Sequence, residues 1–171
     1  MSILNVMWAG GAAYLSTHKV HREILAFADA QEAVSSWLLL PGDSAPLQTI
    51  GAVESLGLSS SRLKGSGWQV LRRLYDRARL KRRLLREAPR LVMLDGIGVA
   101  RYFLPLLRSQ PATQVIVVFH GVKRLRAAEV RLLRGFPAQR LRLLAVSRTL
   151  SEDVARQVQL PVLGVRNALD P

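Results

Sequence analysis

The chain has 171 residues, 49% of them hydrophobic, so it can fold around a core rather than stay disordered. It contains no cysteine, which excludes disulfides and thiolate metal sites. With 25 Lys and Arg against 12 Asp and Glu, its net charge of +13 favours an anionic partner: nucleic acid, a phospholipid surface or a phosphorylated substrate. A solvated excess of arginine, without a partner, is the alternative explanation.

The apolar stretch at residues 3–15 has no Lys or Arg before it. A secretory signal peptide needs a basic segment there, so we interpret this stretch as a first strand and its turn. No run in the sequence approaches the ~18 apolar residues that a membrane-spanning helix needs. We therefore expect a protein that is soluble or peripheral to a membrane.

Short apolar runs alternate with helical patterns along the first half of the chain. The expected elements are a strand at 3–8, a turn at 10–13, a helix from 16 or 17 to about 30, a strand at 34–40, a short helix within the ambiguous segment 47–58, a loop at 59–67 and a long helix at 68–88. The long helix is predicted from apolar residues at helical spacing, namely Leu71, Leu74, Tyr75, Ala78 and Leu85. A proline stops it.

The second half of the chain continues the alternation. Its expected elements are a strand at 91–94, a helix at 99–107, a strand at 114–119, a helix at 125–134, a strand at 141–146, a helix from 147 or 149 to about 158 and a strand at 162–165. Continuously apolar strands that alternate with helices are typical of a parallel sheet with both faces covered.

These elements predict an α/β fold, a Rossmann-like three-layer sandwich with a mainly parallel sheet of about six or seven strands. Such sheets bind ligands at the carboxyl ends of their strands. The sequence stops directly after a strand, whereas a free-standing domain of this type more often ends with a covering helix. We expect residues 1–171 to be the amino-terminal half of a larger protein.

The turn after the first strand contains Gly10 and Gly11. Consecutive glycines let backbone amides approach an anion, and the start of the following helix attracts negative charge. The segment lacks the third glycine of the dinucleotide-binding fingerprint and the Gly-Lys-Ser/Thr of a P-loop. It therefore indicates either a phosphate-facing turn or a tight turn without a ligand.

Two polar residues come directly after later strands. His120 follows the strand at 114–119 and precedes Gly121, so it could hydrogen-bond a sugar hydroxyl or balance developing charge, or merely close the strand. Asp95 follows the strand at 91–94 and could accept a proton from a substrate, or cap the next helix. His18 and His21 share one face of the first helix. Because no third ligand is evident nearby, we expect them to be polar helix residues rather than a zinc site.

Basic residues concentrate in two segments. Between residues 68 and 90 there are nine basic and two acidic residues, a net +7. A basic amphipathic helix of this kind is typical of binding to a membrane surface or a phosphorylated acceptor, or is simply a solvated face. The expected membrane- or acceptor-binding residues are Arg72, Arg73, Arg77, Arg79, Lys81, Arg82, Arg83 and Arg86, with Lys123, Arg124 and Arg126 from the second segment.

Several of these features occur in the order found in one enzyme family. Along the chain they are Gly10-Gly11 after the first strand, His120-Gly121 after a later strand, Leu144–Ser147 before a helix, and Pro161-Val162 leading to Asn167–Asp170. Their order and spacing resemble the amino-terminal half of a GT-B glycosyltransferase of the retaining, metal-independent family 4 type. The resemblance covers nearly the whole chain.

The resemblance implies a role for each matching residue. His120 would be the catalytic residue, in contact with the donor sugar. Asn167 and Asp170 would belong to an asparagine-glycine-x-aspartate signature at the domain junction, in which Ala168 replaces the glycine. The residues expected to bind donor or acceptor are Gly10, Gly11, Asp95, Gly121, Ser147 and Asn167.

The resemblance also implies a function. A nucleotide-sugar co-substrate would be held mainly by a carboxyl-terminal domain that this sequence lacks, with no metal or other cofactor. The chain would hold the acceptor and be inactive alone. With the basic, leucine-rich helix, the resemblance implies an anionic glycolipid or lipopolysaccharide-core acceptor, no nucleic acid, and a cytoplasmic protein peripheral at the inner face of the cytoplasmic membrane.

Two other functions compete with this interpretation. The charge alone fits a basic α/β module that binds nucleic acid, although few aromatic residues interleave with the basic ones and no known motif spacing occurs. A nucleotide-binding oxidoreductase domain fits less well. It would need a third glycine and an acidic residue at the end of the second strand, and Glu32 and Asp43 only flank that strand.

Overall fold

The computed structural model describes residues 2–8, 15–26, 32–39, 51–58, 67–121 and 124–165. The strands are β1 (Ser2–Met7), β2 (Ala33–Leu38), β3 (Ala52–Ser55), β4 (Leu91–Asp95), β5 (Gln114–Phe119), β6 (Leu141–Ala145) and β7 (Val162–Gly164). The helices are α1 (Leu15–Leu25), α2 (Gly67–Glu87), α3 (Gly96–Leu107), α4 (Ala127–Arg134) and α5 (Arg148–Val158), with a 3-10 turn, η2 (Ala138–Arg140).

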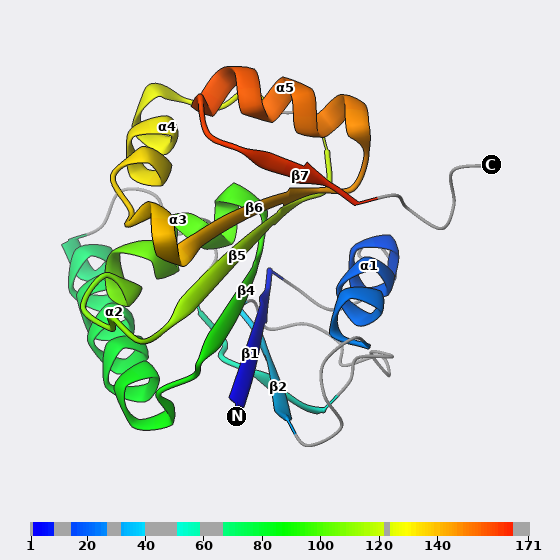
Figure 1. Ribbon diagram of the computed structural model, residues 1–171. Coiled ribbons are helices and arrows are strands. Elements are labelled where there is room, and N and C mark those ends of the chain that lie inside the picture. The colour runs from blue at the N-terminus through cyan, green and yellow to red at the C-terminus, as the bar shows by residue number, and fades with distance from the viewer. Residues whose placement is uncertain are drawn as a thin grey trace.

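The strands of the described residues pair in one parallel sheet with the order β3-β2-β1-β4-β5-β6-β7 (Figure 1). From β1 the chain moves one way to β2 and β3, whereas from β4 it moves the other way to β5, β6 and β7. The direction reverses between β1 and β4, which pair with Ile3 opposite Leu91 and Val6 opposite Leu94. Open α/β sheets bind ligands at such a switch point.

This reversal explains how the helices divide between the two faces of the sheet. Parallel crossovers are right-handed, so helices that follow opposite directions of travel pack on opposite faces. α1 contributes Val20 and Leu25 to a small apolar cluster on its face. α2 to α5 pack on the other face, where Leu84, Phe103 and Val154 belong to the larger core (Figure 1). The molecule thus has the three layers that the sequence predicts, and the predicted fold class is confirmed.

One expected element is wrong. The short helix expected within residues 47–58 is replaced at residues 52–55 by β3, which pairs with β2 from Ala52 opposite Ser35 to Ser55 opposite Leu38. All four β3 residues are exposed. A short edge strand held by backbone hydrogen bonds buries no apolar stripe, so it leaves no periodic signal in the sequence.

Some boundaries also differ from those expected. α3 begins at Gly96, three residues earlier than predicted, because it follows Asp95 without an intervening loop. α4 begins at Ala127 rather than 125, and α1 ends at Leu25.

The predicted long helix is confirmed as α2, but its apolar stripe faces outward. Leu80 and Leu84, which are 4% and 0% exposed, are buried against the sheet. The apolar residues that predicted the helix are themselves exposed: Leu71, Leu74, Tyr75, Ala78 and Leu85. α2 therefore presents apolar and basic side chains together on its outer surface.

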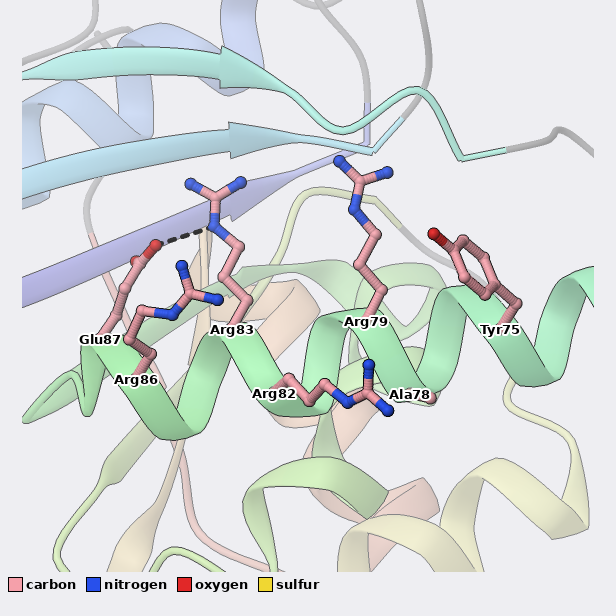
Figure 2. A pocket seen from close by; sticks show the side chains of 7 residues that line it. All are labelled: Tyr75, Ala78, Arg79, Arg82, Arg83, Arg86 and Glu87. Atoms are coloured by element: carbon pink, nitrogen blue, oxygen red, sulfur yellow. Dashed lines mark hydrogen bonds and ion pairs between the residues drawn. The ribbon is translucent and has the colours of Figure 1, made fainter.

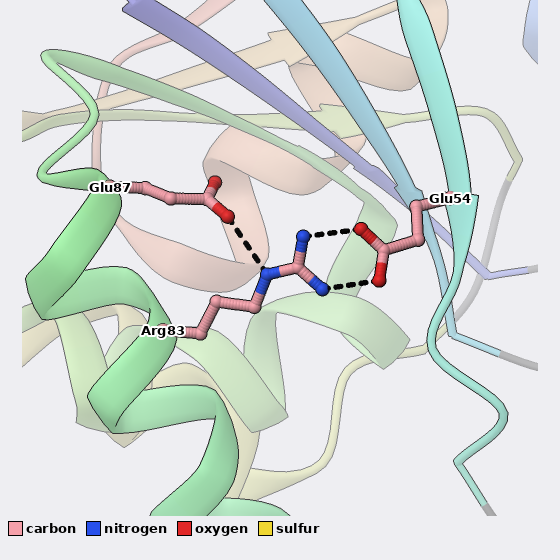
Figure 3. Close-up of polar contacts among 3 residues, drawn as sticks. All are labelled: Glu54, Arg83 and Glu87. Atoms are coloured by element: carbon pink, nitrogen blue, oxygen red, sulfur yellow. Dashed lines mark hydrogen bonds and ion pairs between the residues drawn. The ribbon is translucent and has the colours of Figure 1, made fainter.

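Arg83 ties α2 to the edge of the sheet (Figure 3). Its guanidinium binds both carboxylate oxygens of Glu54 on β3 and donates from Nε to Glu87 at 2.8 Å. It also lies over the buried ring of Trp37, 4.5 Å from the ring centroid. The hydrogen bonds from Arg83 hold the pKa of Glu54 below its usual value. This contact secures an edge strand that buries little surface of its own.

Candidate functional site

A polar cluster lies where β1, β4 and β5 end, beside the switch point. Asp95 is the last residue of β4, His120 follows β5, and His21 reaches the same place from α1. The Nε2 atoms of His21 and His120 are 3.1 Å apart, and their rings stack with centroids 5.2 Å apart. His120 Nε2 lies 3.5 Å from Asp95 Oδ1. The structure thus brings Asp95 and His120, both singled out from the sequence, to one site.

His21 is held by a chain of buried polar groups. Its Nδ1 lies 2.7 Å from Asn5 Oδ1, and Asn5 Nδ2 donates to Ser36 Oγ at 3.2 Å. All three residues are fully buried, with 0% of their surface exposed. Because an amide oxygen can only accept, this network assigns the proton to Nδ1 of His21 and leaves its Nε2 as an acceptor when the ring is neutral. The chain therefore fixes the orientation of the ring that faces His120.

The turn from β4 into α3 positions Asp95. Gly96 has φ +67°, a left-handed conformation that glycine adopts without a steric penalty. The backbone N–H of Trp8, just beyond β1, donates to Asp95 Oδ2 at 3.4 Å. Burial raises the pKa of Asp95 to about 6, and the bond from Trp8 opposes that rise. At neutral pH the carboxylate is ionised and is a stronger base than an exposed aspartate.

His120 is partly buried, with 19% of its side chain exposed. Burial lowers its pKa to about 4, because the charged imidazolium is poorly solvated there. At neutral pH the site therefore holds a neutral imidazole beside a carboxylate rather than an ion pair. Such a pair can donate and accept hydrogen bonds with sugar hydroxyls and can take up a proton. The three residues His21, Asp95 and His120 could also hold a metal ion.

The other predicted donor- and acceptor-binding residues lie elsewhere or outside the described residues. Ser147 is the N-cap of α5, where its Oγ accepts from the N–H of Leu150 at 3.2 Å, so its observed contact is structural. Gly121 is exposed next to His120. Gly10, Gly11 and Asn167 lie outside the described residues, as do Lys123, Ala168 and Asp170.

Four arginines of α2 line a pocket along the helix, and two of them, Arg79 and Arg83, point toward the neighbouring strands (Figure 2). Its lining includes Arg79, Arg82, Arg83 and Arg86, with Tyr75 at one end. Arg83 is neutralised by its two carboxylate partners, whereas Arg77, Arg79, Lys81, Arg82 and Arg86 are exposed. Arg72 and Arg73 lie on the same helix, and Arg124 and Arg126 are exposed before α4. None of the described helices is long and apolar enough to cross a membrane.

Sequence reasoning missed the partners that complete the cluster. His21 is buried and meets His120 from a position 99 residues away in the chain, so the expectation of a polar helix residue without a nearby third ligand is corrected. A signal for its burial was available, since Ile24 and Leu25 lie three and four residues further on and share its face. Asn5, a polar residue within a buried strand, was a second signal.

No family model matches the sequence, and no curated protein is significantly similar to it. Several solved structures share its fold. The glycosyltransferase of Rickettsia africae ESF-5 has a TM-score of 0.62 and 13% identity, over 97% of this chain and 42% of that protein. Anabaena Alr3699/HepE, solved in complex with UDP and glucose, has a TM-score of 0.61 and 15% identity, over 99% of this chain and 45% of its own.

A third structure, a ugt transferase from Siraitia grosvenorii in complex with UDP, has a TM-score of 0.57 and 12% identity. It matches 98% of this chain and 52% of its own length. The chain therefore spans about half the length of these structures or less. At such identities the likeness establishes a shared fold over the matched part of these structures and leaves the reaction to be argued from the site.

Proposed function

We propose that this chain is the amino-terminal, acceptor-side domain of a glycosyltransferase that uses a nucleotide-sugar donor. The observation that carries the proposal is the position of His120 and Asp95 at the switch point of a fold shared with two transferases over 97–98% of the chain. Two of the solved structures hold UDP. The chain matches only 42–52% of the three structures, which supports a second domain that would bind most of the donor.

The proposed chemistry uses the two groups in the states that burial gives them. His120, a neutral imidazole, would hydrogen-bond the donor sugar, and the ionised Asp95 would accept a hydrogen bond or proton from the acceptor hydroxyl. Transfer as proposed needs no metal ion, and the departing diphosphate would be stabilised by backbone amides and basic groups. The resemblance to retaining family 4 enzymes adds retention of configuration and inactivity of this domain alone to the proposal.

The proposed acceptor is an anionic glycolipid of the lipopolysaccharide-core type, reached from the inner face of the cytoplasmic membrane. The outer surface of α2 supports this choice, because Leu71, Leu74 and Tyr75 are 58–67% exposed on the same helix as exposed arginines. Apolar side chains among basic ones suit the boundary between lipid headgroups and acyl chains. A surface for nucleic acid would need the charge but not the leucines, so the lipid partner is favoured.

Transfer activity tests the proposal. The full-length product of the reading frame that carries this sequence is incubated with radiolabelled UDP-sugars and membrane lipid from its source, and label in the lipid fraction is counted. His120→Ala is expected to lower the rate roughly a hundredfold, the scale of a lost acid–base or charge-stabilising contact. Arg156→Gln, on the exposed face of α5, is the matched surface control. Folded protein that transfers label from no nucleotide sugar contradicts the proposal.

Vesicle binding tests the membrane part separately. Arg82→Gln/Arg86→Gln removes two exposed charges from α2, and Arg148→Gln/Arg156→Gln removes two from α5. With about 1 kcal/mol for each basic residue near anionic lipid, the α2 pair should weaken binding to phosphatidylglycerol vesicles roughly 30-fold. The α5 pair should change it little. Equal losses from both pairs, or tighter binding to duplex DNA than to vesicles, would contradict a lipid-binding α2 surface.

A further inference from the structure

Three metal-binding atoms converge at the carboxyl edge of the sheet. One possible ligand atom from each of His21, Asp95 and His120 lies within 4.8 Å of the other two. The two nitrogens are 3.1 Å apart, and His120 Nε2 is 3.5 Å from Asp95 Oδ1. Around a tetrahedral zinc ion, with metal–ligand distances of about 2.0–2.2 Å, ligand atoms are roughly 3.3–3.6 Å apart. Two of the three spacings are therefore close to those of a zinc site.

The carboxylate of Asp95 lies beside the imidazole of His120. The 3.5 Å between His120 Nε2 and Asp95 Oδ1 is long for a hydrogen bond. The same distance fits two ligand atoms that share a tetrahedral metal ion. The carboxylate is also held from its other side, since Oδ2 accepts from the N–H of Trp8. Asp95 thus points Oδ1 toward His120 while its other oxygen accepts from the backbone of Trp8.

The surroundings of His21 are those of a metal ligand. Metal-binding histidines usually donate their second ring N–H to a fixed acceptor, which sets the tautomer and the ring orientation. His21 Nδ1 faces Asn5 Oδ1 at 2.7 Å, and Ser36 holds the Asn5 amide in turn. This arrangement aims the lone pair of His21 Nε2 at the centre of the cluster.

We infer that His21, Asp95 and His120 form a binding site for a divalent first-row transition ion of the zinc type. Two imidazoles and one carboxylate suit Zn²⁺, Co²⁺ or Ni²⁺, whereas Mg²⁺ and Ca²⁺ prefer sites made of oxygen ligands. Three protein ligands leave the fourth position of a tetrahedral ion open. His120 and Asp95 keep 19% and 12% of their side chains exposed, so an ion can reach the site from solvent.

Binding has defined consequences for the cluster. When its Nε2 binds the ion, His120 carries its proton on Nδ1. The two Nε2 atoms, which lie close together, then bind the same ion. The site stands independently of the proposed glycosyl transfer, because it requires only the three side chains. If the transfer proposal also holds, an ion bound to His120 and Asp95 occupies the two groups that would contact the sugar and the acceptor hydroxyl, and it inhibits the enzyme.

Cobalt binding tests the site without any sugar substrate. Chelator-treated protein is titrated with Co²⁺, whose visible absorption distinguishes four-coordinate protein sites from the hydrated ion, and Zn²⁺ is then added as a competitor. We expect an intense four-coordinate spectrum at equimolar Co²⁺ that Zn²⁺ abolishes. His21→Gln, His120→Gln and Asp95→Asn should each weaken binding at least tenfold, and Asn5→Ala roughly tenfold or more through His21. His18→Gln, which removes the remaining histidine of the sequence, is the matched control.

Nuclear magnetic resonance of the wild-type protein provides a test that does not depend on whether any substituted protein folds. Zn²⁺ should shift the ring nitrogen signals of two histidines and leave the third unchanged. A Co²⁺ spectrum that stays that of the hydrated ion, or equal loss of binding in His18→Gln and His21→Gln, would overturn the inference. Metal binding without sugar transfer would leave this site standing and contradict only the proposed function.

Discussion

The buried pair Asp95 and His120 predicts an unusual dependence of stability on pH. Burial raises the pKa of Asp95 from 3.8 to about 6 and lowers that of His120 from 6.5 to about 4. Between pH 4 and 6 the folded pair keeps one proton, on Asp95. The unfolded pair also keeps one proton in this range, on the histidine. Stability changes with pH only where folded and unfolded states bind different numbers of protons, so the wild-type pair should contribute almost no slope.

When either residue is replaced, the unfolding free energy should change with pH as the remaining residue titrates. In Asp95→Asn the unfolded chain binds a proton at His120 that the folded one does not, so stability rises from pH 4 to 6.5, by about 3 kcal/mol in all. In His120→Gln the folded chain binds a proton at Asp95 that the unfolded one does not. Stability is then full below pH 3.8 and falls by about 3 kcal/mol as the pH rises through 6.

Urea unfolding of the three proteins at pH 4.5, 5.0 and 5.5 measures these slopes, with a chelator present so that no cation holds the cluster. Relative to wild type, we expect about +1 kcal/mol per pH unit for Asp95→Asn and about −1 for His120→Gln. Titrating groups outside the cluster are common to the three proteins and cancel in the difference. Parallel curves for all three would refute the buried, oppositely shifted pair.

Three further predictions concern the scaffold, each measured as the free energy of unfolding in urea. Leu84→Ala should cost about 2–5 kcal/mol, because Leu84 lies on the buried face of α2. Leu85→Ala, on the exposed face, should cost well under about 1 kcal/mol. Similar costs for the two variants would contradict the observed orientation of α2. Ser147→Ala should cost about 1 kcal/mol by removing the N-cap of α5, and Ser147→Thr should restore most of it. Glu54→Gln should cost less than about 1 kcal/mol, because its bond to Arg83 is half exposed, and the cost should shrink in high salt.

Sequence patterns predicted the parts of the fold that bury continuous apolar runs. The central strands and α2 to α5 follow from such runs and their helical spacing. β3 did not, because an edge strand of four exposed residues depends on backbone pairing with β2 rather than on burial. The orientation of α2 was also hidden, since exposed Leu74 and buried Leu84 look alike in the sequence. Which of its two apolar stripes a helix buries depends on how each stripe packs against the side chains of the sheet.

The candidate site was predictable where it follows from topology. His120 and Asp95 come directly after strands, and a parallel sheet brings the ends of neighbouring strands together. His21 comes from a helix, and its place beside His120 depends on the three-dimensional packing of α1 against the sheet. The same holds for the buried Asn5 that orients His21. A polar residue in a buried strand indicates that it has a hydrogen-bond partner, but the sequence does not show which residue that partner is.

The length of the natural reading frame tests most directly the claim that this chain is one half of a two-domain glycosyltransferase. We predict that the frame continues past residue 171 by about the length of the present chain, into a second α/β pattern that would bind most of the donor. A frame that stops at residue 171 would contradict the proposed transferase, and the basic binding module would then explain the arginine-rich surface better.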